Sequence, residues 1–386
     1  MSNNSSLMPA KIFVNAKEDR FQDWYRRWQG IPSIEVTSKG RIFVDFYTGQ
    51  DAEVGGNVIM LCVSDDCGKT FQSCATVVEH PDKECRLYDP NLWIDPFGRL
   101  WMSYNQARGF NDGRSGVWIT ICDDPDAEVL KWSEPKRIAN GIMMNKPLIT
   151  SKNEWLFPCA IWCDTSGSVP TERHGLESEQ FPNVYVSTDE GKTFTLRGHA
   201  DMPGRSFDEH MLVERKDKSL WMLMRIFAGI GESFSYDGGY TWTPGRISHI
   251  EGPCSRFHIR RLKSGRLLMI NHYCFNERID LEDIMNQGNV KSWKGRSHLT
   301  AMLSDDDGET WPFTLLLDER NEVSYPDAKE ADDGYIYVTY DHERVKEREI
   351  LLARFTEDDI LKGEFKSEGS FVRCLVNKAL GQPDIH

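Results

Sequence analysis

Three short segments of the sequence bring charged and polar side chains together at the starts of predicted strands. Asp89, Lys146, Arg256 and His258 supply a carboxylate, an ammonium, a guanidinium and an imidazole, which are groups that bind sugars or move protons. We interpret these four residues as candidates for a substrate pocket, with polar turn chemistry at strand edges as the alternative. The chain has a formal net charge of −14, so an anionic substrate would need a local basic pocket of this kind. The segments are 88–91, 144–147 and 255–258.

A repeated motif indicates what positions these residues. The pattern Ser-x-Asp-x-Gly-x-Thr-Trp/Phe occurs four times. The Asp carboxylate can cap backbone N–H groups and the Gly takes a positive φ, so each copy predicts a tight turn that leaves a strand. A motif found four times predicts a fold built from repeated units. The copies are residues 64–71, 187–194, 235–242 and 304–311.

A second series of turns predicts the number of units. Six short polar turns are each followed by a hydrophobic run, which is typical of hairpins. Six hairpins predict an all-β, six-bladed β-propeller with about four strands in each blade. We expect residues 1–386 to form this single domain, with the strand 349–355 and the N-terminal segment closing the ring. The turns lie at 38–42, 95–100, 151–155, 216–220, 263–267 and 332–336.

Little helix is expected outside two short segments. Thr356 precedes acidic residues in 357–361, which predicts an N-capped short helix. Residues 280–287 have the composition of one or two further helical turns. The loop 163–180 is polar and is expected at the surface.

The repeated motif resembles the Asp box of the sialidase (neuraminidase) superfamily, whose members are six-bladed propellers. The resemblance implies an exo-acting glycosidase, similar to an exo-α-sialidase, that removes a terminal acidic sugar from a glycan. The box itself is structural, so it supports the fold more directly than the reaction.

The same resemblance implies a set of site residues. Glu209 stands before one strand and Arg225 ends the next, as the Glu and one Arg of the sialidase site do. Arg296 precedes the strand of the last motif copy and matches a second arginine of the sialidase triad. Tyr325 precedes the last hairpin and matches the catalytic tyrosine.

A tyrosine nucleophile has a physical rationale in this family. The anomeric carbon of sialic acid already bears a carboxylate, which would repel a carboxylate nucleophile. A neutral phenol avoids this repulsion, and an adjacent Glu can take its proton. Tyr325 and Glu209 are therefore expected to act as a pair.

The sequence departs from the family at the first blade. Gly30 stands where sialidases have the first arginine of the triad, which leaves the identity of the acidic sugar open. Arg26, Arg27 and Arg256 are candidates to replace that arginine. The loop that follows the first hairpin should carry the acid/base, and it offers Asp51 and Glu53.

Two other functions fit the same residues. One is a propeller enzyme of another class: a hydrolase with a carboxylate pair such as Asp89 and Glu209, or a polysaccharide lyase. A lyase needs a cation and a Tyr or His base, which Lys146, His210, His258 or Tyr325 could supply; His210 is thus a further substrate-contact candidate. The other is a glycan-binding propeller without catalysis.

Composition narrows the partners. An acidic chain is not expected to bind nucleic acid or an anionic membrane. The family resemblance implies a glycan as the partner, and the oligomeric state is open. The ten cysteines have no zinc-type spacing, so no metal or cofactor is expected. Residues 1–11 lack the apolar core of a signal peptide, and no run of about 18 apolar residues occurs, so we expect a cytoplasmic protein.

Overall fold

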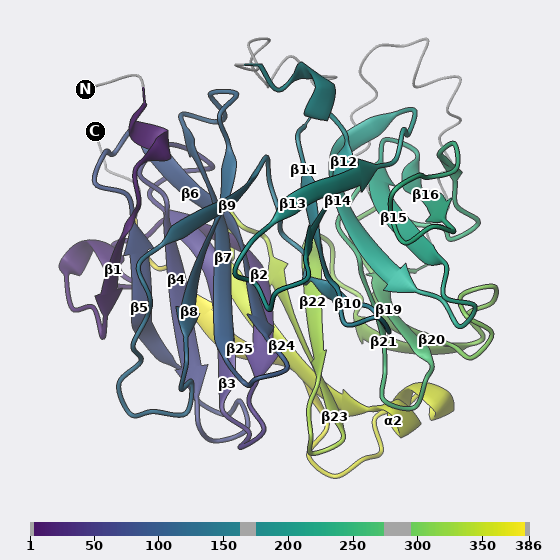
Figure 1. Ribbon diagram of the computed structural model, residues 1–386. Helices are drawn as coiled ribbons and strands as arrows, with labels where there is room; N and C mark the ends of the chain where they lie inside the picture. The colour runs from purple at the N-terminus through teal and green to yellow at the C-terminus, as the bar shows by residue number, and fades with distance from the viewer. Residues whose placement is uncertain (1–3, 163–174, 274–294, 383–386) are drawn as a thin grey trace.

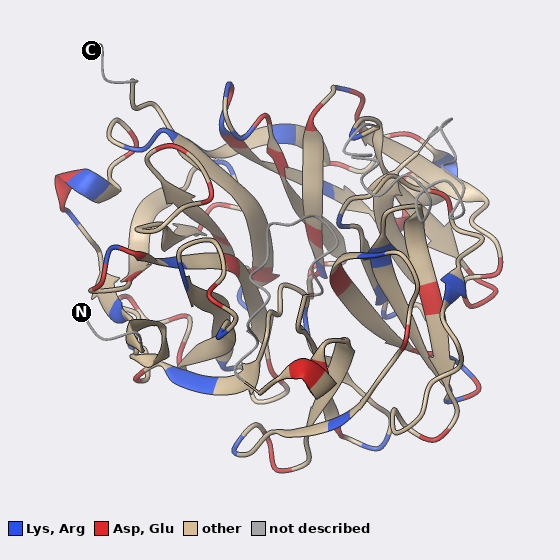
Figure 2. Ribbon diagram, turned by 90° about the horizontal axis from the view of Figure 1, so that it is seen from above, with Lys and Arg blue, Asp and Glu red and all other residues tan. Residues whose placement is uncertain are grey.

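Six antiparallel sheets form a six-bladed β-propeller, which confirms the predicted fold. The computed structural model describes residues 4–162, 175–273 and 295–382. Figure 1 shows the sheets side by side, and Figure 2 shows them from above, arranged around a common centre.

Each blade is a meander of neighbouring strands. The first blade contains β1 (Lys11–Val14), β2 (Trp28–Val36), β3 (Ile42–Gly49), β4 (Val58–Ser64) and β5 (Gln72–Glu79). The second contains β6 (Cys85–Ile94), β7 (Leu100–Arg108), β8 (Gly116–Cys122) and β9 (Lys136–Asn140). The third contains β10 (Leu148–Ile149), β11 (Trp155–Ala160), β12 (Pro182–Ser187) and β13 (Thr195–His199).

The other three blades have four strands each. The fourth contains β14 (Arg205–Glu214), β15 (Leu220–Ile226), β16 (Gly229–Ser235) and β17 (Arg246–Ile247). The fifth contains β18 (His258–Arg261), β19 (Leu267–His272), β20 (Leu299–Ser304) and β21 (Phe313–Asp318). The sixth contains β22 (Val323–Glu330), β23 (Tyr335–His342), β24 (Glu349–Thr356) and β25 (Phe371–Lys378). The innermost strands are β2, β6, β10, β14, β18 and β22, and β2 contacts both β6 and β22 of the two neighbouring blades.

Helix is scarce in the described ranges, as expected. The predicted short helix is α2 (Glu357–Lys362), where Thr356 accepts a hydrogen bond from the N–H of Asp359 and the Asp359 carboxylate accepts one from the N–H of Thr356. Three 3-10 helices cover Ser5–Leu7, Asp19–Phe21 and Glu177–Glu179. No helix among the described residues is long and apolar enough to span a bilayer. The expected turns at 280–287 lie outside the described residues.

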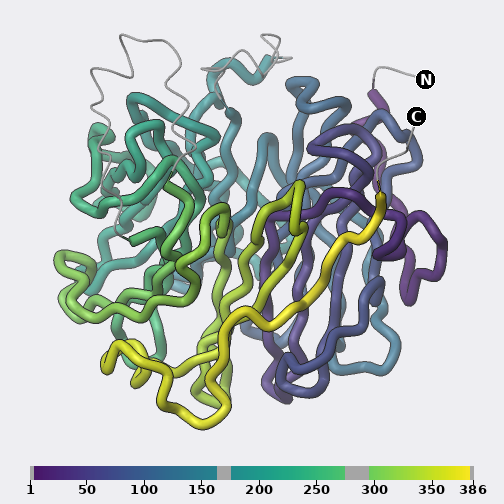
Figure 3. The backbone as a smooth tube through the Cα atoms, turned by 180° about the vertical axis from the view of Figure 1, so that it is seen from behind, coloured from purple at the N-terminus to yellow at the C-terminus, as the bar shows by residue number. Residues whose placement is uncertain are grey.

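The ring closes differently from our expectation. β24 pairs with β23 and β25, so the sixth blade is built only from C-terminal strands, while β1 pairs with β5 at the outer edge of the first blade. The chain ends still meet, as Figure 3 shows, because the N–H groups of Leu380 and Gly381 donate to the carbonyls of Asp23 and Arg26. Hydrogen bonds between the two ends take the place of a shared blade.

The four motif copies form the same turn between the last two strands of a blade. In the copy of the fourth blade, Asp237 accepts hydrogen bonds from the N–H and the hydroxyl of Thr241, at 3.0 and 2.6 Å, and from the hydroxyl of Ser235 at 2.9 Å. The turn of the third blade also packs closely against the second blade. Gly191 in this turn has φ +82°, and a Cβ added there would lie 2.3 Å from the Trp101 ring of the second blade.

We expect Asp237→Ala to lower the free energy of unfolding by about 1 kcal/mol, because the turn loses its cap. A urea titration measures this. Asp305→Ala is the matched control, because Asp305 is an exposed motif residue outside the cap. Turnover per folded molecule should not change, and a tenfold loss of turnover at unchanged stability would contradict a purely structural role.

Acid should weaken all four turns together. The Thr hydroxyl in each turn is the largest influence that lowers the pKa of the capping Asp, to about 2. A lowered folded-state pKa stabilises the protein above the ordinary value near 4, and this contribution disappears as the pH falls through about 2.

Candidate functional site

Four inner strands carry a bulge at the same end of the ring. The register shifts at Ile31, Asp89, Glu209 and Tyr325, where φ is 59°, 46°, 44° and 53°. Left-handed backbone is costly for residues other than glycine, and bulges of this kind redirect side chains near functional sites. The bulges place residues from β2, β6, β14 and β22 around one region of the axis.

Tyr325 and Glu209 meet in this region. The Tyr325 hydroxyl donates a hydrogen bond of 2.8 Å to Glu209 Oε1, which satisfies the distance that a nucleophile–base pair requires. Arg225 Nη1 lies 2.5 Å from Glu209 Oε1 and 2.7 Å from the Tyr325 oxygen. All three side chains are buried, and Glu209 Oε2 has no hydrogen-bond partner within the described ranges.

The electrostatics keep the phenol neutral at rest. Burial is the largest influence and raises the pKa of Tyr325 well above its ordinary value, while the Arg225 guanidinium opposes this rise. The hydroxyl accepts from Arg225 and donates to Glu209, so a base and a stabilising cation both touch the oxygen. This arrangement suits a phenol that loses its proton only as it reacts.

Two further guanidinium groups face the ring of Tyr325. The Arg344 guanidinium carbon lies 4.2 Å from the ring centroid, and that of Arg296 lies 5.4 Å away. Arg225 and Arg296, both singled out in the sequence, therefore converge with Tyr325 and Glu209.

Arg344 was missed by the sequence analysis. It follows β23, whose end pairs with the start of β22, so the strand register brings it beside Tyr325. Its Nε donates to Asp341 Oδ2 at 2.7 Å, and its side chain covers Gly30. The sequence does show Asp341 and Arg344 close together at the end of β23. Recognising them as part of the site, however, requires knowing that β23 pairs with β22.

The three acidic candidates differ in position. Asp51 is 69% exposed and pairs with Arg27 at 2.8 Å, so it points away from the Tyr325 group. Glu53 lies 3.6 Å from both Arg344 and Arg86, which places it at the edge of that group. Asp89 is buried, and burial, followed by the nearby Glu53 carboxylate, raises its pKa to about 8.

Lys146, Arg256 and His258 lie apart from the Tyr325 group. They form a buried network around Asp327. Lys146 Nζ lies 2.9 Å from Asp327 Oδ2, His258 Nδ1 lies 3.1 Å from Asp327 Oδ1, and Arg256 lies 3.6 Å away. Burial would raise the pKa of Asp327, but Lys146 and His258 hold it far below its ordinary value.

The reason for this placement is the backbone. Lys146 precedes a proline, as Asp89 and Tyr325 do, but it lacks their left-handed conformation. Its ammonium group therefore enters the axis and donates to the carbonyls of Ile34 and Leu92, both at 2.7 Å. These cations hold the inner strands together.

His210, Arg26 and Arg256 are also structural. The imidazole of His210 lies 2.8 Å from the carbonyl of Asn183, and burial lowers its pKa to about 4. Arg26 is buried and bonds to Gln29 and other residues near the chain ends, and Arg256 bonds to Asn145. None of them replaces the arginine that residue 30 lacks.

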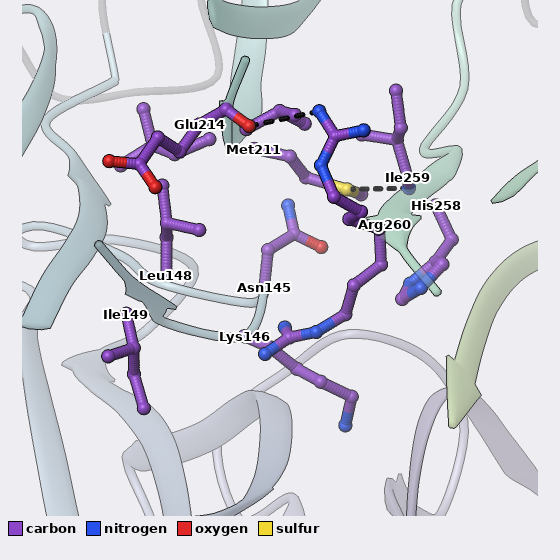
Figure 4. Close-up of a pocket in the computed structure, with 12 residues that line it drawn as sticks. Asn145, Lys146, Leu148, Ile149, Met211, Glu214, His258, Ile259 and Arg260 are labelled. Atoms are coloured by element: carbon purple, nitrogen blue, oxygen red, sulfur yellow. Dashed lines mark hydrogen bonds between the residues drawn. The ribbon is translucent and has the colours of Figure 1, made fainter. Parts of the chain in front are cut away.

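A cavity of about 240 Å³ lies between the inner strands of the third, fourth and fifth blades (Figure 4). It is lined by the later residues of β14, the start of the third blade and β18, including Met211, Glu214 and Arg260. Glu209 precedes Met211 on β14, so the cavity begins just beyond the Tyr325 group along this strand. Lys146 and His258, two of the substrate-pocket candidates from the sequence, also line the cavity. Among its lining residues there is no tyrosine paired with a carboxylate, so the Tyr325 group is the stronger candidate for the chemistry.

Several solved structures share this propeller fold. The Hadza microbial sialidase Hz136 has a TM-score of 0.63 and 17% identity, covering 86% of this chain and 66% of that one. This chain therefore spans slightly less than two thirds of that sialidase. The intramolecular trans-sialidase from Ruminococcus gnavus, solved with oseltamivir carboxylate, has a TM-score of 0.63 and 12% identity, covering 91% of this chain and 98% of that one.

A third similar structure is named for a different activity. The α-L-arabinanase from Penicillium chrysogenum, solved with arabinobiose, has a TM-score of 0.57 and 11% identity, covering 92% of this chain and 99% of that one. Such identities show the shared fold alone. No curated protein sequence matches the chain. The model of the BNR repeat-like domain matches residues 40–338. The chain therefore belongs to the BNR repeat-like domain family.

Proposed function

We propose that the protein is a retaining, exo-acting glycoside hydrolase that removes a terminal acidic sugar, sialic acid or a related sugar, from a glycan. The observation that carries this proposal is the buried contact of 2.8 Å between the Tyr325 hydroxyl and Glu209, with Arg225 touching both groups. A phenol paired with a carboxylate base suits attack on an anomeric carbon that already bears negative charge.

The proposed reaction has two steps. In the first, the Tyr325 oxygen bonds to the anomeric carbon, Glu209 takes the phenol proton, and the glycosidic bond breaks as an acid protonates the leaving oxygen. In the second, water attacks the same carbon, the acid residue takes a proton from that water, and the bond from that carbon to the Tyr325 oxygen breaks as Glu209 returns its proton to Tyr325. Two displacements retain the anomeric configuration.

Arg225 and Arg296 would hold the sugar carboxylate beside the reacting carbon. Guanidinium groups match a carboxylate with two parallel hydrogen bonds, which fixes its orientation as well as its charge. Their convergence on Tyr325 supports this role, because the carboxylate and the reacting carbon are adjacent atoms of the substrate.

We assign the acid to Asp89 rather than to Asp51 or Glu53. A buried carboxyl with a pKa of about 8 is protonated at neutral pH, which is the state that a general acid needs. Glu53 lies in ion pairs with two arginines, so its part is to keep the pKa of Asp89 high.

The assignment predicts a pH profile. We expect kcat/KM to fall above about pH 8, tenfold per pH unit, as Asp89 loses its proton. Glu53→Gln removes a like charge, so the falling limb should move to lower pH. Asp51→Asn is the matched control and should leave the limb in place, whereas a limb that does not respond to Glu53→Gln would contradict the assignment.

A substrate screen tests the function itself. Purified protein is offered fluorogenic sialosides, uronides and neutral glycosides, with ultraviolet absorbance read in parallel for unsaturated products. Fluorophore release from an acidic glycoside supports the proposal. Release from neutral sugars alone, as from arabinosides, or an unsaturated uronide product would replace it with another hydrolase or with a lyase.

A further inference from the structure

We propose that Arg344 supplies the third guanidinium for the substrate carboxylate, in place of the arginine that residue 30 lacks. This inference rests on the proposed function and concerns how that site recognises charge. Arg344 comes from the segment between β23 and β24 in the sixth blade, whereas Gly30 lies in β2 of the first.

The two positions compete for one volume. A Cβ built on Gly30 would lie 2.6 Å from Cδ, 2.8 Å from Nε and 2.9 Å from Cγ of Arg344. Separations below about 3 Å are too close for carbon atoms that are not bonded to each other. A side chain at residue 30 and Arg344 in its present place therefore exclude each other, and glycine at residue 30 is what admits the arginine from the neighbouring blade.

Local contacts fix the Arg344 side chain. Nε donates to Asp341 Oδ2 at 2.7 Å, and Nη2 donates to Ser324 Oγ at 3.2 Å. The same Asp341 oxygen accepts the N–H of Ile31 at 2.8 Å, so one carboxylate holds both the arginine and the bulge of β2. Pre-organisation of this kind reduces the entropy lost when an anion binds.

The Arg344 guanidinium can donate further hydrogen bonds. Over the described ranges, Nη1 has only a contact of 3.6 Å with Glu53, which is longer than a hydrogen bond. The group also lies 4.2 Å from the centre of the Tyr325 ring, next to the proposed nucleophile. A carboxylate on the anomeric carbon would thus meet Arg344 from one side and Arg225 and Arg296 from the others.

The site is locally basic. The guanidinium groups of Arg86, Arg225, Arg296 and Arg344 gather beside Glu53, Glu209, Asp341 and Tyr325. Such a cluster inside a chain of net charge −14 is the local basic pocket that an anionic sugar needs.

The test is a binding cycle at pH 7 by calorimetry. The probes are N-acetylneuraminic acid and D-glucuronic acid, each compared with its uncharged methyl ester. The variants are Arg344→Ala, Arg344→Lys, Gly30→Ala, the double variant Arg344→Ala with Gly30→Ala, and the relocation variant Arg344→Ala with Gly30→Arg. Lys346→Ala is the control, because Lys346 is a cation of the same segment with an 81% exposed side chain. Melting temperatures check that each variant folds.

Arg344→Ala should weaken binding of the acid about 10- to 100-fold, as expected for a lost hydrogen bond between charged groups, and should leave the ester unchanged. Gly30→Ala should weaken acid binding because it displaces Arg344, and it should have no further effect once Arg344 is removed. Arg344→Lys should recover only part of the affinity, and the relocation variant should recover most of it.

The outcomes separate the inference from the function. Equal acid binding by wild type and Arg344→Ala would overturn the inference while hydrolysis of acidic glycosides left the proposed function standing. Equal losses for acid and ester would also overturn it, because they would indicate a structural role. Binding of the acid without hydrolysis would remove the proposed function, and the variants would still decide the inference. If wild type binds neither acid, both are overturned.

Discussion

Tyr325→Phe should lower kcat by about three orders of magnitude or more, because the substitution removes the atom that forms the covalent bond. The phenyl ring still fills the buried position, and Arg225 still pairs with Glu209 at 2.5 Å, so the melting temperature should change little. Steady-state kinetics on the glycoside found by the screen, with thermal melting of the same samples, measures both quantities.

The double variant of Tyr325→Phe with Glu209→Gln shows whether the two residues share a step. If Glu209 acts only through the Tyr325 hydroxyl, the double loss should be close to the larger single loss. Losses that multiply would show that the residues act independently. Tyr340→Phe is the matched control, because Tyr340 is a buried tyrosine of the same blade whose hydroxyl bonds to Asp318 instead.

Arg225→Leu should have the largest effect on stability, a loss of about 3–5 kcal/mol in the free energy of unfolding. Glu209 is buried, with a side chain 2% exposed, and it forms an ion pair with Arg225. Removal of the guanidinium leaves a buried carboxylate without its cation, which costs more than the pair contributes.

The companion variant distinguishes this cause from lost packing. Glu209→Gln added to Arg225→Leu removes the buried charge and should recover much of the stability, but not the activity. Lys362→Leu is the surface control, because its pair with Asp358 is about half exposed and should be worth about 1 kcal/mol or less. No recovery in the double variant would mean that packing, not charge, holds Arg225 in place.

The sequence predicted the parts of the site that local pattern and family resemblance define. Glu209, Arg225, Arg296 and Tyr325 occupy fixed places relative to hairpins and to the turn motif, and the structure brings all four together. Turn chemistry is local, so the number of blades also followed from it.

Features that depend on contacts between blades were not predictable in the same way. Arg344 reaches over Gly30 from a different sheet, and only the pairing of β22 with β23 places it there. Lys146 and Asp89 both precede proline, yet only Asp89 takes the left-handed backbone that turns it toward the site. A single sequence does not distinguish these two conformations, which is why the sequence grouped Lys146 with Asp89.

The most direct measurement is the covalent intermediate. Wild-type protein is incubated with 2,3-difluoro-N-acetylneuraminic acid, whose fluorine next to the anomeric carbon slows breakdown of the intermediate, and is then digested for peptide mass spectrometry. The account predicts one added sugar on the peptide that contains Tyr325, and none in Tyr325→Phe. Hydrolysis of sialosides with inversion and without an adduct, or an adduct on Asp89 or Glu209, would contradict it.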